Sequence, residues 1–300
     1  MKLERVIVRQ KEYSRRGVQL NSSEESIKYT SDLLQNAQEP MFLLSVLNTK
    51  GYVISTTVLS VNDFLENKQE VLANAVLSGG AAVIAADTYD SDITSEKLCR
   101  EISELVMAAG ARMLDYIQTS KERVLKLPYI EASRKYQFSR PVDMDSKYII
   151  NNLYLETEGS LDIKEPTIIH AIGAIAHDFS TRDREHFGVL NLDEYDEPIN
   201  YSIISVGNID SAYVGMRESI ITPLLSEAKN CIFFHNHPSG DIIKSKEDID
   251  IAEKLKYALS KFGVTVCDNI IIGEDAIYSF AMDAKLNIYH EMEKEEEYSF

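Results

Sequence analysis

The sequence predicts an α/β protein of two domains that repeat one arrangement of strands and helices. Short apolar runs alternate with amphipathic helical patterns along most of the 300 residues. A polar stretch without periodicity, residues 131–150, interrupts this alternation and contains Pro141. The same order of elements then recurs. We therefore predict domains at residues 1–130 and 151–290, joined by a linker over 131–150 and followed by an acidic tail over 291–300.

In the first domain, turn and helix-start signals separate the predicted elements. The run Asn21-Ser-Ser-Glu-Glu25 is typical of a helix start, and Asn48-Thr-Lys-Gly51 is typical of a hairpin turn. The predicted order is strand 3–9, helix 21–38, strands 41–47 and 52–59, helix 67–77, strand 81–86, helix 95–117 and strand 123–130.

The second domain repeats this order. Its first helix opens at Glu165-Pro166, and proline suits a first helical turn. The predicted elements are strand 154–157, helix 165–179, strands 187–192 and 199–206, helix 217–228, strand 231–234, helix 245–262 and strand 264–272. Matching segments indicate an internal duplication; the alternative is chance similarity between two regular α/β units.

Two histidines stand at the end of one predicted strand. Cys231-Ile-Phe-Phe234 is an apolar run, and Pro-Ser-Gly stops it shortly afterwards. Side chains alternate between the two sides of a strand, so His235 and His237 are expected on the same side. Two neutral imidazoles placed in this way are typical of a metal-binding pair.

The next predicted helix supplies a third ligand. Ser245 is its expected N-cap, and Asp248 begins the stripe that faces the sheet, which continues through Ile251, Ala252, Leu255, Leu259 and Phe262. A capping box is the alternative role for Ser245 and Asp248, but it explains neither histidine. His235, His237 and Asp248 make three ligands, and catalytic zinc keeps its fourth position open.

This pattern resembles the JAMM metalloproteases, also called MPN+ or JAB domains, whose signature is His-x-His, seven residues, then Ser-x-x-Asp. The run His235–Asp241, with Cys267–Gly273 and Tyr278–Phe280, is similar to the RadC-type branch over roughly residues 160–283. The resemblance implies tandem MPN/JAB-like (cytidine-deaminase-like) domains, each a mixed sheet flanked by helices. It also implies one Zn²⁺ per chain. RadC-like proteins usually carry histidine at Asn269, a position outside the ligand set.

The resemblance also implies a catalytic glutamate from an earlier strand, in the pattern Glu-x-x-Gly. Glu185-His-Phe-Gly188 matches, so Glu185 is the expected general base, and Ser245 is expected to stabilise the oxyanion. Glu218, at a predicted helix start, is the alternative base. Without the family pattern, Glu185 would be interpreted as a solvated residue in a charged run.

The first copy lacks these ligands. Aligning the two copies places Ala86 and Thr88 at the histidine positions, with Leu98 or Cys99 at the position of Asp248. Alanine and leucine offer no donor to a metal, and a threonine hydroxyl is a poor zinc ligand. The first domain is therefore predicted to be metal-free, and to bind substrate, a partner chain or the second domain.

Other polar side chains have simpler interpretations. Ser239 beside His237 would need a free histidine base to act as a nucleophile, and both histidines serve better on metal. Cys231 is expected in the core, and His170 and His177 are expected to be ordinary partly buried histidines.

Two functions follow. The first is a zinc metallohydrolase of peptide or isopeptide bonds, acting on a protein or peptide substrate. The second is a non-catalytic scaffold or DNA-repair-associated RadC-like protein with a structural or vestigial metal.

Composition bears on the partners and the cellular location of the protein. A formal net charge of −17 disfavours direct nucleic-acid binding. No apolar run has the length of a membrane span, and the N-terminus lacks the apolar core of a signal peptide, so we expect a cytoplasmic protein. Cys99, Cys231 and Cys267 show no paired spacing and each lies beside apolar residues, so they are expected as buried free thiols. The oligomeric state is left open, with a homo-oligomer among the alternatives.

Overall fold

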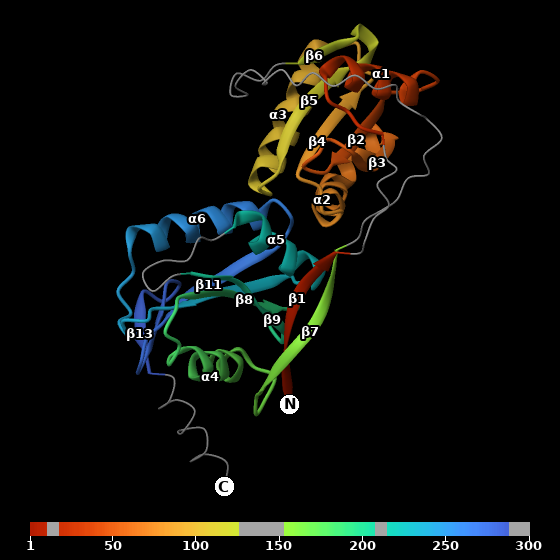
Figure 1. The fold of residues 1–300 in the computed structure, drawn as a ribbon. Coiled ribbons are helices and arrows are strands. Elements are labelled where there is room, and N and C mark those ends of the chain that lie inside the picture. The colour runs from red at the N-terminus through yellow and green to blue at the C-terminus, as the bar shows by residue number, and fades with distance from the viewer. Residues whose placement is uncertain (11–17, 126–152, 208–214, 288–300) are drawn as a thin grey trace. The chain divides into compact units, whose positions relative to one another are not determined.

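The computed structural model describes residues 1–10, 18–125, 153–207 and 215–287. It divides into two compact units, one of Met1–Arg9 with Tyr154–Phe300 and one of Gln10–Leu153 (Figure 1). The predicted linker at 131–150 and the acidic tail at 291–300 lie outside the described residues. In the parts of the chain that are described, no helix has both the length and the apolar character needed to cross a membrane.

The C-terminal unit is a mixed eight-stranded sheet in the order β13-β12-β11-β10-β8-β9-β1-β7. Helix α4 covers one face of this sheet, and α5 and α6 lie over the other (Figure 1). The strands are β1 (Lys2–Gln10), β7 (Leu153–Asp162), β8 (His186–Leu192), β9 (Pro198–Val206), β10 (Asn230–Asn236), β11 (Thr265–Ile272), β12 (Ile277–Ser279) and β13 (Ala284–Leu286). The helices are α4 (Ile168–Phe179), α5 (Met216–Leu225) and α6 (Lys246–Ser260).

Strand β1 corrects the predicted start of the first domain. It was expected to open the N-terminal unit, but it lies in the C-terminal sheet between β9 and β7. It runs parallel to β9, with Arg5 opposite Tyr201. Leu3 is fully buried in the same apolar cluster as Ile163. The pattern of β1 predicted a strand, but which sheet it joins depends on partners far along the chain.

The N-terminal unit is a five-stranded sheet in the order β3-β2-β4-β5-β6. Alternation along β2 separates its two faces: Leu43 packs in a core cluster with α1, while the neighbouring Phe42 ring stacks on Phe64 of α2 at 3.9 Å. The elements are α1 (Ser23–Leu34), β2 (Met41–Leu47), β3 (Val53–Ser60), α2 (Val61–Leu77), β4 (Ala82–Asp87), α3 (Asp92–Ala108), β5 (Arg112–Gln118) and β6 (Arg123–Leu125).

One predicted helix, 95–117, is wrong in its second half. Helix α3 ends at Ala108, and Gly110 follows with a φ of 70°. This left-handed conformation favours glycine and stops the helix. The chain then returns as β5, where Tyr116 and Ile117 are buried. Alternation over so short a segment could not be distinguished from the end of the helical stripe.

The two units share one topology over five strands. In the N-terminal unit β2 pairs antiparallel with β3 and β4, β4 runs parallel to β5, and β5 pairs antiparallel with β6. Strands β8, β9, β10, β11 and β12 pair in the same way. Even the register shift recurs, between Val83 and Ile84 in one unit and between Cys231 and Ile232 in the other. Both units are mixed α/β layers.

The strand pairing also corrects the predicted alignment of the two units by one residue. Asp87 lies opposite Phe42 at the end of β4, and His235 lies opposite Phe187 at the end of β10. Asp87 therefore corresponds to His235, where Ala86 was expected. The N-caps of α3 and α6 are Ser91 and Ser245, so Thr94 corresponds to Asp248 instead of Leu98 or Cys99.

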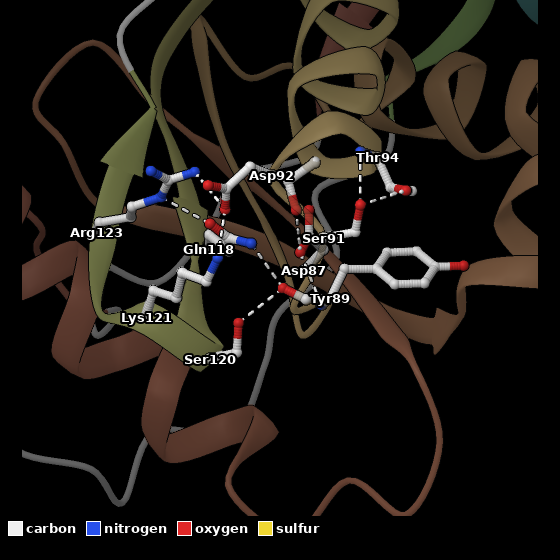
Figure 2. A network of polar contacts seen from close by, with 10 residues as sticks. Asp87, Tyr89, Ser91, Asp92, Thr94, Gln118, Ser120, Lys121 and Arg123 are labelled. Carbon is white, nitrogen blue, oxygen red and sulfur yellow. Dashed lines mark hydrogen bonds and ion pairs between the residues drawn. The ribbon is translucent and has the colours of Figure 1, made fainter.

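A polar network occupies this end of β4. The fully buried Asp87 carboxylate accepts hydrogen bonds from the Tyr116 hydroxyl at 2.6 Å, from Ser95 at 2.9 Å and from the Tyr89 amide at 2.9 Å. Burial raises the pKa of the Asp87 carboxyl, and the Tyr116 and Ser95 hydrogen bonds oppose that rise. Figure 2 also shows the Gln118 amide directed at the main-chain carbonyl of Tyr89. The ring of Tyr89 points away from the network. The hydrogen bonds of this network thus engage both oxygens of the Asp87 carboxylate.

Asp87→Ala is expected to lower the free energy of unfolding by about 3 kcal/mol, because buried donors on Tyr116, Ser95 and the Tyr89 amide would lose their acceptor. Urea unfolding of the full chain, followed by circular dichroism, measures the loss. The control is Asp90→Ala, an exposed carboxylate in the same loop. Equal stability of the two variants would contradict a structural role for Asp87.

Candidate metal centre

The end of β10 brings two imidazoles together, as the alternation of the strand predicts. Phe233 and His235 lie on one side of β10, where Phe187 on β8 stacks on Phe233 at 5.5 Å and on His235 at 6.2 Å, and His237 follows just after the strand. The His235 and His237 rings are 5.0 Å apart. Both side chains are largely buried, with 6% and 17% of their surfaces exposed. The aromatic column thus limits where the His235 ring can lie.

Asp248 joins these histidines from the first turn of α6, and it also forms a capping box. Its Oδ2 accepts from the Ser245 amide at 2.7 Å, while the Ser245 hydroxyl accepts from the Asp248 amide at 3.1 Å. Its other oxygen, Oδ1, lies 3.2 Å from His235 Nε2. One oxygen of the carboxylate therefore forms the capping box, and the other faces His235, where a ligand would lie.

The three donor groups have the spacing of a metal site. His235 Nε2 lies 3.2 Å from His237 Nε2 and 3.2 Å from Asp248 Oδ1, and His237 Nε2 lies 3.8 Å from Asp248 Oδ2. Zinc bonds of 2.0–2.2 Å in a tetrahedron separate neighbouring ligand atoms by about 3.3–3.6 Å. Within the described parts of the chain, these three residues form the one group of possible ligands whose atoms lie within 4.8 Å of one another.

The electrostatics favour a cation at this point. Burial raises the pKa of the Asp248 carboxyl, but the hydrogen bond and charge of His235, with hydrogen bonds from Ser245, outweigh this effect, and the pKa is lowered. The carboxylate is therefore charged at neutral pH. Two imidazole nitrogens that face each other need a proton or a cation between them, because two lone pairs repel. The donor set thus fits a divalent metal such as zinc.

Asn236 connects this strand to the segment that carries Glu185. Its fully buried side chain accepts from the His186 amide at 2.8 Å and donates to the Arg184 carbonyl at 3.0 Å. These two backbone groups flank the half-buried Glu185. Extending the alternation of β8 by one step places Glu185 on the same side as Phe187, which is the side of His235. Asn236 therefore fixes the backbone on both sides of the predicted base, Glu185.

The glycine of the Glu-x-x-Gly pattern has a packing reason. A Cβ at Gly188 would lie 2.4 Å from Cζ of the Phe234 ring and 2.7 Å from the Ser202 carbonyl oxygen. Real Cβ atoms do not approach neighbours so closely, so the aromatic ring and the adjacent strand exclude any side chain there. In the Glu-x-x-Gly pattern, the glutamate is thus the predicted base, and the glycine is required by the close packing of β8 on its neighbours.

The remaining sequence candidates lie in simpler surroundings. Glu218 is exposed in the first turn of α5, and its carboxylate folds over Gly215. Cys231 is fully buried, which raises the pKa of its thiol, whereas Cys267, expected to be buried, is exposed. His170 is buried beside Thr167, whereas His177 is exposed. The Ser245 hydroxyl donates to Asp248 Oδ2 at 2.7 Å, so its role toward an oxyanion stays a prediction.

Sequence reasoning missed Asn236 and Asp241. Asp241 Oδ1 lies 3.2 Å from His237 Nδ1, and hydrogen bonds from Ser239, the Ile243 amide and His237 lower the pKa of its carboxyl to about 2. The signal for Asn236 was present, since it is a polar residue on the core side of a buried strand. Asp241 had no such signal, because acidic residues are common in loops.

Fold and site together define an α/β protein with a His-His-Asp donor set at the end of a central strand. A sequence profile of the RadC-like JAB domain matches residues 166–286. A UPF0758 protein of Clostridium acetobutylicum is 39% identical over 210 residues, which are 70% of this chain and 85% of that relative. UPF0758 proteins of Coprothermobacter proteolyticus and Syntrophomonas wolfei are 28% and 26% identical, over 65% and 74% of this chain and 81% and 94% of their own lengths. The chain belongs to the RadC-like JAB domain family.

Proposed function

We propose that the C-terminal unit is a zinc-dependent hydrolase of the JAMM type that cleaves peptide or isopeptide bonds in a protein or peptide substrate. The observation that carries the proposal is the convergence of His235, His237 and Asp248 without a fourth side-chain donor in their group, among the residues described. Three protein ligands with one position left for water are the mark of a catalytic zinc, whereas structural zinc takes four protein ligands. When bound there, zinc would polarise a carbonyl group and acidify water.

The chain's own residues supply the proton transfers. Glu185 takes a proton from the attacking water and later gives it to the leaving amine, so one carboxylate serves as base and then as acid. Asn236 fixes the backbone on both sides of Glu185, and so fixes the point from which its side chain extends. The Ser245 hydroxyl is a donor for the developing oxyanion once it turns away from Asp248.

The proposal is tested on the purified full chain with matched peptide and isopeptide substrates, the latter joined through a lysine side chain. Hydrolysis by the zinc-loaded protein, its loss after treatment with a chelator and its return on adding zinc are expected. Turnover that survives removal of the metal would contradict the mechanism. A loaded protein that cleaves neither bond type would favour the alternative below.

The alternative is a non-catalytic RadC-like scaffold with a structural or vestigial metal. The capping box favours it, because Ser245 and Asp248 already have a structural role at the start of α6. The Glu185-x-x-Gly188 pattern weighs against it, since a purely structural metal needs no base.

We also infer that the two units arose by duplication and that the N-terminal unit is a degenerate copy without metal. The shared topology and the matching register shift support this inference. In an experimental structure, strands β2–β5 are expected to superpose on β8–β11 with Asp87 at the place of His235. A different strand order would reject it.

A further inference from the structure

The loop after β10 holds a carboxylate against the outer nitrogen of one predicted ligand. Asp241 Oδ1 lies 3.2 Å from Nδ1 of His237, the ring nitrogen that faces away from His235. The same ring points Nε2 at His235 and Asp248. His237 therefore makes one polar contact outward and its metal-facing contacts inward.

Asp241 is itself held in place by its own loop. The Ser239 hydroxyl donates to Oδ2 at 2.6 Å, and the Ile243 amide donates to Oδ1 at 2.9 Å. Gly240, with a φ of 79°, turns the chain between them, and its carbonyl accepts from the Glu274 amide at 3.1 Å. The carboxylate thus meets His237 from a loop that is fastened to the segment after β11.

The contact determines which ring nitrogen carries the hydrogen. An ionised carboxylate can only accept, so Nδ1 of His237 must be the donor in this pair. In a neutral imidazole the lone pair is then on Nε2, the nitrogen directed at His235 and Asp248. Without Asp241, the ring could bind its hydrogen on either nitrogen and rotate more freely.

We propose that Asp241 is a positioning residue that fixes the tautomer and direction of His237, so that Nε2 of His237 is preformed as a ligand for zinc. The inference rests on the proposed function, because it assigns a role toward the same metal. A simpler role for Asp241 is to stabilise its own turn through the Ile243 amide. The two roles differ in what they do to His237.

The first experiment measures zinc affinity on the full chain, by competition with a chelator, for the wild type, Asp241→Ala, Asp241→Asn and a control. Asp241→Ala is expected to bind zinc about 10–100-fold more weakly. Asp241→Asn is expected to lose less, since its amide oxygen still accepts from Nδ1. The control, Glu253→Ala, removes the same charge from the exposed side of α6 and is expected to keep the wild-type affinity.

A second readout reports the ring itself. In the zinc-loaded wild type, nitrogen NMR is expected to show His237 with a slowly exchanging Nδ1 hydrogen, and Asp241→Ala is expected to lose that signal. If Asp241→Ala is less stable but keeps both the zinc affinity and the Nδ1 signal of His237, Asp241 only stabilises its turn, and the inference is overturned. A wild type that binds no zinc would instead remove the proposed function itself, and this inference with it.

Discussion

His235→Ala and Asp248→Asn are each expected to reduce the zinc content of the purified protein from about one per chain to about a tenth or less, because two remaining ligands cannot compete with water and buffer for the ion. Asparagine at 248 keeps a capping oxygen for the Ser245 amide, so the start of α6 should persist. Elemental analysis after dialysis measures the content.

The matched control for these variants is His177→Ala, which removes an exposed histidine from α4 in the same unit. It should retain the full zinc content. A full zinc content in both His235→Ala and Asp248→Asn would contradict the assignment of these residues as ligands. The wild-type stoichiometry also tests the N-terminal unit, where Asp87 is already engaged by Tyr116 and Ser95, so a second tightly bound zinc would contradict its metal-free state.

Glu185→Gln is expected to retain zinc while losing about 10²–10⁴ in turnover, because glutamine has nearly the same shape but cannot accept a proton. The measurement is kcat on the best substrate found with the wild type, together with the zinc content of each sample. Retained zinc separates a loss of chemistry from a loss of the site.

Glu218→Gln serves as the matched control, since it makes the same substitution on α5 and is expected to leave turnover unchanged. Wild-type turnover in Glu185→Gln, with a loss in Glu218→Gln, would transfer the role of base to Glu218. Loss in neither variant would require a different source of the proton acceptor.

Local patterns allowed the grouping of His235, His237 and Asp248 to be predicted from the sequence. The alternation of a strand was enough to place His235 and His237 on one side, and the spacing from Ser245 to Asp248 was enough to predict the start of a helix. Such patterns depend only on residues a few positions apart, so they can be recognised in the amino-acid sequence. The strands and helices around the site were predicted for the same reason.

Support for the site was not predictable in the same way. Asn236 acts through backbone groups of the segment 182–186, about fifty residues earlier in the chain. Asp241 contacts Nδ1 of His237, the ring nitrogen opposite the one that faces His235 and Asp248. The Asn236 contacts require two segments that meet only in the folded unit, and the Asp241 contact lies within a loop that has no periodicity, so the pattern of the sequence predicted neither.

By itself, the sequence predicted the candidate donor set, the order of most elements and the repetition of that order. The tertiary structure alone decided that β1 joins the C-terminal sheet, and that Asp87 instead of Ala86 stands at the place of His235. The physical reason is the same in both cases. A strand's own residues encode its alternation, but its partner and register are chosen by hydrogen bonds and side-chain packing across the whole sheet.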